Sequence, residues 1–238
     1  MKQDYKHPRV FLNAALEKNA VISLDKNQTH YFRTVLRRKE GDNLRVFNGK
    51  DGEYLAVIKA LDKKSIEIEL KEQIREQPKK VQRLSLYFSP IKTPRLSTMI
   101  EKAVELGVSD LYPVLTQHTE KRYLNIDRTK SQIIEAAEQC ERLDIPVFHE
   151  SQKFNEFVKT LDRLVLVALE RKNAPPLKDI SAGKGDLSFL IGPEGGFTDE
   201  EIHTMEKNNY MVPMSLGENI LRSETASVAC LAWARLSF

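Results

Sequence analysis

Residues 187–202, LSFLIGPEGGFTDEEI, constrain the fold of this 238-residue chain more than any other stretch. An apolar run, typical of a buried strand, enters a loop with three glycines and a proline, and the loop opens into a helix start. Thr198 and Glu201 have the spacing of a capping box, which places the first helical turn after the loop. This order is typical of a corner that presents backbone to a ligand, although the same glycines would also serve a tight turn without one.

The chemistry of this loop argues against a phosphate ligand. No lysine follows the glycines as it does in a GxxxxGK[ST] loop, and Gly192, Gly195 and Gly196 do not match the GxGxxG pattern. Asp199 and Glu200 already bring negative charge to the helix start, where a phosphate would otherwise bind. These charges favour a ligand with an adenosine-like body, no phosphate and a positive charge. S-adenosylmethionine, which carries a sulfonium, fits that description.

A second corner follows near the carboxyl end of the chain. After the strand-like run MVPMSLG, which ends at Gly217, comes ENILRSETASVACLAWARL. Ile220 and Leu221 are apolar in a predicted loop, where they cover either a ligand ring or the adjacent core. Ser223 is predicted to cap the last helix. Arg222 either forms a surface ion pair with a nearby glutamate or faces the site and stabilises negative charge on a reacting group.

The rhythm of apolar residues changes near residue 80 and predicts two domains. Residues 1–74 contain several short strands, including the alternating SIEIELKE, and one short helix capped by Asp25, which indicates a small β-barrel. Residues 75–80, REQPKK, are charged, include a proline and are predicted to form a linker. Residues 81–238 alternate apolar strands with amphipathic helices. We therefore predict an α/β domain with a parallel sheet covered on both faces.

Charge is unevenly distributed along the chain. Residues 1–80 hold 18 Lys and Arg against 12 Asp and Glu, whereas the remainder holds 19 basic and 22 acidic residues. This asymmetry indicates a nucleic-acid contact through the N-terminal part. Cys140 and Cys230 belong to no paired motif, and no apolar run is long enough for a membrane span or a signal peptide. We therefore expect a reduced, cytoplasmic protein with no membrane partner, and the spacing of the histidines predicts no metal site.

Two C-terminal motifs carry a family resemblance. FLIGPEGGFTDEEI and SLGENILRSETASVACLAW resemble the paired motifs of the RsmE family, the 16S rRNA (uracil-N3) methyltransferases of the SPOUT superfamily. Residues 100–119 resemble the family's ELG helix and the strand that follows it, and residues 30–58 resemble its PUA-like RNA-binding barrel. Residues 133–146 resemble its EAAxQ helix, although Glu141 stands where many members have glycine.

The resemblance implies a fold, an assembly and a cofactor. It implies a trefoil knot over about residues 165–238, which the general rules of chain connection disfavour, and a homodimer with cofactor sites near the interface. It also implies that S-adenosylmethionine lies bent across three loops, which hold the expected cofactor-binding residues Leu169, Glu170, Gly192, Pro193, Glu194, Gly195, Gly196, Leu216, Gly217, Ile220, Leu221 and Arg222.

The implied reaction is methylation of N3 of a uridine in the 16S rRNA of the small ribosomal subunit. It requires loss of the N3 proton, because the neutral imide nitrogen has no available lone pair. We assign Arg222 to orienting the base or stabilising its anion, and Glu194 or Glu224 to accepting the proton. The expected RNA contacts lie in the N-terminal domain, at Arg9, Arg33, Arg37, Arg38 and Lys39.

Two alternatives stay open. One is a SPOUT enzyme that methylates another RNA position, in a transfer RNA or 23S rRNA, and the other is a non-catalytic RNA-binding assembly factor. Titration with S-adenosylmethionine would separate the assembly factor from both kinds of enzyme.

Overall fold

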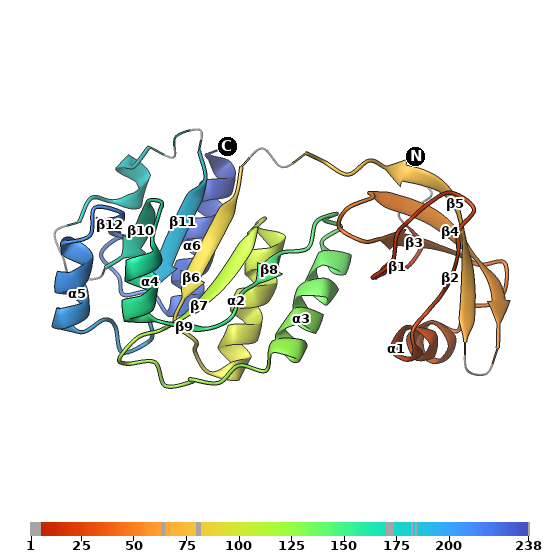
Figure 1. The fold of residues 1–238 in the computed structure, drawn as a ribbon, viewed down its shortest axis with the longest axis horizontal. Helices are drawn as coiled ribbons and strands as arrows, with labels where there is room; N and C mark the ends of the chain where they lie inside the picture. Colours follow the sequence, from red (N-terminus) through yellow and green to blue (C-terminus); the bar gives the residue numbers. More distant parts are fainter. Residues whose placement is uncertain are drawn as a thin grey trace. The chain divides into compact units, whose positions relative to one another are not determined.

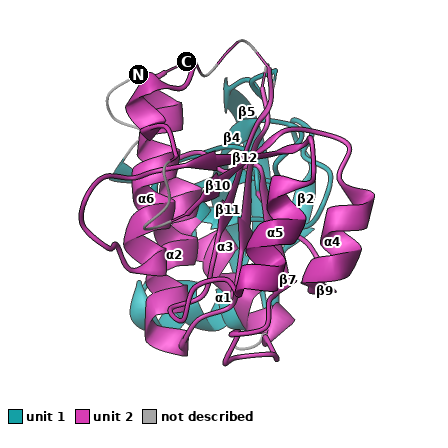
Figure 2. Cartoon of the chain, turned by 90° about the vertical axis from the view of Figure 1, so that its left-hand side faces the viewer, with its two compact units in different colours: residues 1–79, 137–145 teal, residues 80–136, 146–238 magenta. Residues whose placement is uncertain are grey.

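The computed structural model describes residues 6–62, 65–79, 82–169, 174–181, 183 and 185–237. The chain separates into two compact units, of which unit 1 comprises residues 1–79 and 137–145 and unit 2 comprises residues 80–136 and 146–238 (Figure 2). Unit 1 therefore takes a short segment from the middle of the sequence, which the sequence pattern did not predict. Figure 1 labels the helices and strands in chain order.

Unit 1 is built on a five-stranded sheet in the order β1-β3-β4-β5-β2. β1 pairs in parallel with β3, and the other neighbours are antiparallel. Along β5, Ile66, Ile68 and Leu70 are fully buried whereas Glu67 is exposed, so the predicted alternation is confirmed. The strands are β1 (Arg9–Phe11), β2 (Val21–Ser23), β3 (Asn43–Phe47), β4 (Glu53–Leu61) and β5 (Ile66–Arg75).

A short helical segment connects β2 to β3. α1 (Lys26–His30) begins after Asp25, whose carboxylate accepts the backbone N–H of Gln28, and this confirms the predicted cap. The helix continues as the π-helical turn η2 (Tyr31–Val35). Phe32 is buried in the core of unit 1, whereas Tyr31 and Val35 are exposed.

A buried carboxylate at the start of β4 gathers three arginines. Glu53 is fully buried, and its oxygens pair with Arg9, with Arg45 at 3.6 Å and with Arg75 at 3.3 Å. Several positive charges around one buried carboxylate offset the cost of removing that carboxylate from water. The cluster therefore depends on Glu53, which is the acceptor that these arginines share.

The expectation that Arg9 belongs to an exposed basic surface is wrong. Its side chain is buried, and its guanidinium lies 3.6 Å from the centre of the Phe47 ring. The guanidinium also donates hydrogen bonds to the carbonyl oxygens of Ala137 and Arg142, each 2.7 Å long. Arg9 thus holds residues 137–145 to the sheet of unit 1 and is not available to a phosphate.

Glu141 has a backbone conformation that explains why many members of the family that this chain resembles have glycine at this position. Its φ is +61°, in the left-handed region that a side chain disfavours. Two contacts hold it there: Arg45 donates to its carboxylate at 2.7 Å, and Arg75 donates to its carbonyl oxygen at 2.9 Å. The glutamate therefore keeps the turn and adds an ion pair to it.

Unit 2 is built on a parallel sheet in the order β12-β10-β11-β6-β7-β8, with β9 paired to β7. Every residue of the central strands β6 and β11 is buried, as predicted for a sheet covered on both faces. The knot implied by the resemblance stays a prediction. The strands are β6 (Leu84–Phe88), β7 (Asp110–Leu115), β8 (Val147–Phe148), β9 (Gln152–Lys153), β10 (Val165–Ala168), β11 (Leu187–Ile191) and β12 (Met211–Met214).

Helices cover the two faces of this sheet. α6 packs against α2 and contacts β6 and β11, while α5 contacts β12 and α4 contacts β7 on the other side (Figure 2). Pro94 lies in the first turn of α2, as predicted. The helices after β5 are α2 (Thr93–Glu105), α3 (Ile126–Gln139), whose last residues belong to unit 1, α4 (Phe154–Thr160), α5 (Asp199–Glu206) and α6 (Ser223–Leu236), with a 3₁₀ turn η3 (Leu177–Asp179).

The strand order determines where the loops of unit 2 meet. β12 lies on the far side of β10 from β11, so the chain passes over β10 between β11 and β12. Because the three strands are parallel, the loops that follow them leave the same edge of the sheet. The two corners singled out in the sequence are therefore neighbours in space.

Replacing Glu53 by alanine is expected to destabilise the protein by about 3–5 kcal/mol, because buried guanidinium groups lose their shared partner. Glu69→Ala is the matched control, since Glu69 pairs with the partly exposed Lys71 and water competes for that pair, so its loss should change stability little. Urea denaturation of both variants measures the difference. Equal midpoints would contradict the role assigned to Glu53.

Candidate functional site

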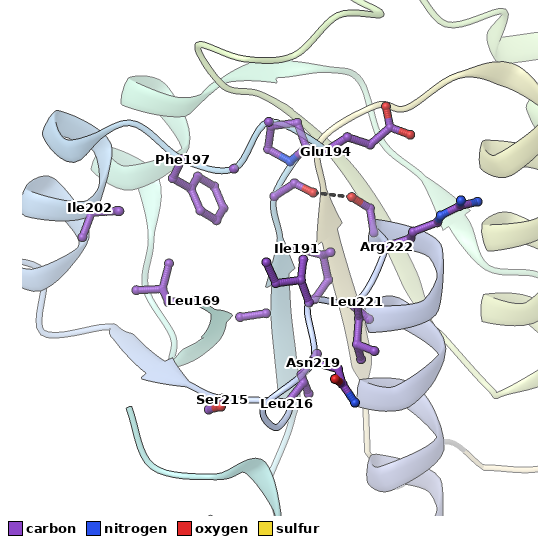
Figure 3. Close-up of a pocket in the computed structure, with 18 of the residues that line it drawn as sticks. Leu169, Ile191, Glu194, Phe197, Ile202, Ser215, Leu216, Asn219, Leu221 and Arg222 are labelled. Carbon is purple, nitrogen blue, oxygen red and sulfur yellow. Dashed lines mark hydrogen bonds between the residues drawn. The ribbon is translucent and has the colours of Figure 1, made fainter. Parts of the chain in front are cut away.

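A cavity of about 650 Å³ lies at the carboxyl ends of β10, β11 and β12. Its walls come from the segments after these three strands and from the first turns of α2, α5 and α6 (Figure 3). All but one of the residues expected to bind a cofactor line it, namely Leu169, Gly192, Pro193, Glu194, Gly195, Gly196, Leu216, Gly217, Ile220, Leu221 and Arg222. The remaining one, Glu170, lies outside the described residues.

The loop after β11 needs glycine at two positions for different reasons. A Cβ on Gly192 would lie 2.8 Å from the Phe197 ring, so a side chain there would clash with that ring. Gly196 has a φ of +69°, and its N–H donates to the carbonyl oxygen of Pro193 at 2.9 Å, which closes a tight turn. The loop consequently exposes backbone along one wall of the cavity.

His118 supports this loop from the segment after β7. Its Nδ1 lies 3.1 Å from the carbonyl oxygens of both Gly195 and Gly196. His118 is at the end of the stretch 100–119 that carries part of the family resemblance, but no local signal pairs it with Gly195, which is 77 residues away along the chain. It fixes the orientation of the two glycine carbonyls.

The start of α5 is as acidic as the sequence predicted. Thr198 accepts the N–H of Glu201, and the Glu201 carboxylate accepts the N–H of Thr198 at 3.0 Å, so the capping box is confirmed. The same carboxylate accepts the N–H of Gln117 at 2.8 Å. Asp199 lines the cavity beside these groups. A phosphate at this helix start would be repelled by the carboxylates that are already there.

The loop after β12 is held at its start, where Ser215 makes two backbone hydrogen bonds. The N–H of Ser215 donates to Pro175, and the carbonyl oxygen of Ser215 accepts the N–H of Leu177, both at 2.9 Å. Gly217 follows with a φ of +118°, a conformation that favours glycine. Ile220 is 57 % exposed although it lines the cavity, so part of its apolar surface has no cover from the described chain.

The predicted cap of α6 is wrong. Arg222 occupies the cap position without a side-chain hydrogen bond, and Ser223 is the first helical residue. The Ser223 hydroxyl instead donates to the carbonyl oxygen of Gly192 at 2.8 Å (Figure 3). Spacing alone could not distinguish the two arrangements, because the partner of Ser223 is in the other loop. This hydrogen bond links the two corners directly.

Charged side chains form an outer rim on the cavity. The rim consists of Arg95, Glu194, Arg222 and Glu224; Arg95 pairs with Glu194, and its Nε lies 3.8 Å from Oε1 of Glu224. Glu194 and Arg222 extend outward from the rim, away from Leu169 (Figure 3). Glu224, a predicted proton acceptor, does not line the cavity itself and belongs to the rim only through its contact with Arg95.

Several cavity residues were not predicted from the sequence. The ends of two buried strands could have identified Ala168 and Ile191, because the carboxyl edge of a parallel sheet is where ligands bind. The sequence identifies Asp199 and Ser223 only as residues at helix starts, and no local pattern marks the others. The residues that were missed are Arg95, Ala168, Ile191, Phe197, Asp199, Ile202, Ser215, Asn219, Ser223 and Ala226.

The expected RNA-contact residues are in unit 1, whereas the cavity is in unit 2. Arg33, Arg37 and Lys39 are exposed on or after η2, and Arg38 is half-buried. Among the described residues, no group of three or more His, Cys, Asp or Glu side chains is arranged to hold a metal ion. No helix in the same part of the chain has the length and apolar character needed to cross a membrane.

Comparisons with known families cover both units. The RNA methyltransferase domain family matches residues 77–235, and the RNA methyltransferase PUA domain family matches residues 24–71. These matches confirm the predicted PUA-like fold of the N-terminal part and the α/β methyltransferase fold of the remainder.

Individual proteins are similar over nearly the whole chain. Ribosomal RNA small subunit methyltransferase E of Rickettsia conorii is 36 % identical over 97 % of this chain and 96 % of its own length, and that of Synechocystis is 31 % identical over 90 % and 72 %. Two solved structures, each 26 % identical, superpose with a TM-score of 0.87 and cover 97 % of both chains. One is a methyltransferase of Legionella pneumophila in complex with its cofactor SAM. The other is ribosomal RNA small subunit methyltransferase E of Neisseria gonorrhoeae bound to S-adenosylmethionine.

Ser223→Ala is expected to lower the stability of the protein by about 1 kcal/mol, because it removes a partly buried hydrogen bond between the two corners. Thr225→Ala, at an exposed position of the same helix, is the matched control. Thermal denaturation measures both. A Ser223 variant as stable as the control would show that the link contributes nothing.

Proposed function

This chain belongs to the ribosomal RNA small subunit methyltransferase E (RsmE) family, and on that premise we propose that it methylates N3 of a uridine in 16S rRNA with S-adenosylmethionine as the methyl donor. The observation that carries the proposal is the cavity formed by the two C-terminal corners. It contains the residues that the family resemblance had selected from the sequence, apart from Glu170, which lies outside the described residues.

The cavity fits the proposed cofactor in size and in chemistry. Its volume of about 650 Å³ is within the range of roughly 300–1,000 Å³ typical of small-molecule sites. Glycine backbone at 192 and 195–196 permits close approach of a flat ring, and Leu169, Phe197 and Ile220 supply apolar walls. Asp199 and Glu194 add negative charge, which suits a sulfonium.

The chain's own residues have to bind, orient and deprotonate the target base. S-adenosylmethionine, when bound, supplies an electrophilic methyl group. We propose that Glu194 or Glu224 accepts the N3 proton, because both carboxylates belong to the rim. Arg222, on the outer side of the rim, orients the RNA or stabilises negative charge on it.

Unit 1 is the proposed RNA-binding part. We infer that Arg33, Arg37 and Lys39 contact phosphates together with Arg38, because these cations are close together in the sequence and three of them are exposed. The domain division proposed from the sequence, residues 1–74 and 81–238 with a linker at 75–80, assigns RNA contacts to the first part and methyl transfer to the second.

We further infer a homodimer that acts in the cytoplasm on the small ribosomal subunit. Small, half-buried residues on α6, such as Ala229 and Ala232, would permit close packing against a second copy. The cytoplasmic location follows from the proposed substrate, ribosomal RNA.

The wild-type protein is expected to transfer a methyl group from S-adenosylmethionine to small subunits that lack the modification, and nucleoside mass spectrometry should identify N3-methyluridine. Gly192→Ala should weaken cofactor binding by roughly tenfold or more, because overpacking against Phe197 costs about 1–3 kcal/mol. Gly185→Ala, where an added Cβ would meet nothing within 4 Å, should bind normally. Calorimetric titration measures both affinities.

These measurements separate the proposed function from its alternatives. A methylated nucleoside other than N3-methyluridine, or methyl transfer to transfer RNA or 23S rRNA alone, would exclude the proposed target. Absence of cofactor binding in the wild-type protein would leave a non-catalytic RNA-binding role.

The double variant Arg37→Ala/Lys39→Ala is expected to bind 16S rRNA more weakly and with a shallower salt dependence, by about 0.7–0.9 in log–log slope for each phosphate that the protein no longer neutralises. Lys178→Ala/Lys207→Ala removes two exposed cations from unit 2 and is the matched control. Filter binding over a salt series measures the slopes. Identical slopes for the two double variants would contradict the proposed RNA contact of unit 1.

A further inference from the structure

One guanidinium joins the two carboxylates of the rim. Arg95, in the first turn of α2, pairs with Glu194 of the loop after β11, and its Nε lies 3.8 Å from Oε1 of Glu224 in the first turn of α6. The Arg95 side chain is 38 % exposed and lines the cavity. Three elements that are far apart in the sequence thus bring one cation and two carboxylates together.

The two contacts of Arg95 are unequal. Glu224 is 16 % exposed, and its Oε2 is buried without a hydrogen-bond partner among the described residues. A buried carboxylate oxygen without a donor is costly, and 3.8 Å is too long for a hydrogen bond. Glu194 lies further out, where water competes for its ion pair. Glu224 is therefore the more enclosed of the two carboxylates and holds Arg95 by charge alone, and Glu194, whose ion pair faces water, is the partner that a ligand can displace.

We propose that Arg95 is a catalytic residue that donates hydrogen bonds to a carbonyl oxygen of the target uracil and stabilises the N3 anion, with Glu224 as the residue that positions it. This inference rests on the proposed function. Loss of the N3 proton spreads negative charge onto O2 and O4, where a guanidinium has its greatest effect. Arginine suits the role because it stays charged at any pH at which the enzyme operates and offers five N–H donors.

The exchange of partners also prepares the proton acceptor. When Arg95 turns from Glu194 to the base, the Glu194 carboxylate loses its hydrogen-bond donor and is free to accept the N3–H of the uracil. The N3–H bond breaks, the proton passes to the Glu194 carboxylate, and the electron pair stays on N3. N3 then takes the methyl group, and the pair from the broken carbon–sulfur bond remains on sulfur.

The position of Arg95 also bears on the choice of base. Cytosine has no N3 proton to give to a carboxylate, and it presents an amine donor where uracil presents O4. That amine would face the donors of Arg95, which disfavours the wrong base by leaving donors unpaired. Arg222 also lines the cavity but has no ion pair with either carboxylate of the rim among the described residues, so the test below compares it with Arg95.

The test compares Arg95→Gln with Arg95→Lys in methyl transfer to small subunits, from neutral pH to the alkaline range in which the uracil imide ionises unaided. Arg95→Gln is expected to lower kcat by roughly 10²–10³-fold at neutral pH, with little change in KM or in cofactor affinity. The deficit should shrink as pH rises, since the substrate then needs less help to lose its proton. Arg95→Lys should retain part of the rate.

Lys92→Ala is the matched control, because Lys92 caps the same helix, is 67 % exposed and pairs with Glu120 instead of the rim. It should follow the wild-type pH profile. The ratio of rates at two pH values is taken within one preparation, so a smaller folded fraction of a variant does not imitate the expected result.

Each of the following outcomes would overturn the assignment. A deficit in Arg95→Gln that is independent of pH, or that is matched by weaker cofactor binding, would indicate a structural role. The same pH-dependent deficit in Arg222→Ala but not in Arg95→Gln would transfer the role to Arg222. Full activity of Arg95→Gln would remove the assignment while the proposed function stands, whereas failure of the wild-type protein to form N3-methyluridine would remove both.

Discussion

The parallel arrangement of β10, β11 and β12 is the constraint on which the cavity depends. Parallel strands send the segments that follow them to one edge, so three loops that are separate in sequence have to share a small volume. The hydrogen bond from Ser223 to Gly192 then fixes the distance between two of these loops. Binding chemistry at this edge therefore follows from the backbone arrangement before any particular side chain is considered.

The loops could be located from the sequence because their signals are local. Glycines, a proline and a capping box identify a corner whatever the rest of the chain does, so Gly192, Gly196 and Thr198 could be placed in advance. Arg95 has no such signal, because its importance comes from Glu194, 99 residues away, and from Glu224 on another helix. A side chain whose role depends on distant partners cannot be assigned from its neighbours in the sequence.

At Arg9 the prediction from the sequence failed for a different reason, because burial of a charged side chain leaves no local signal. Composition counts every arginine as a surface charge, and only the folded chain shows that Glu53 and Phe47 enclose this one. Glu141 is a related case, since its left-handed backbone would have predicted glycine. The glutamate at this position instead accepts a hydrogen bond from Arg45, and this ion pair stabilises the side chain in the left-handed turn.

The discontinuous make-up of unit 1 has a consequence for limited proteolysis. A single cut after β5 would sever the chain between residues 1–79 and the rest, yet Arg9 and Arg75 would still hold carbonyl groups of residues 137–145. The two fragments would therefore remain associated under native conditions and migrate separately only in denaturant. Nicking here would leave a complex that resembles the intact chain in solution.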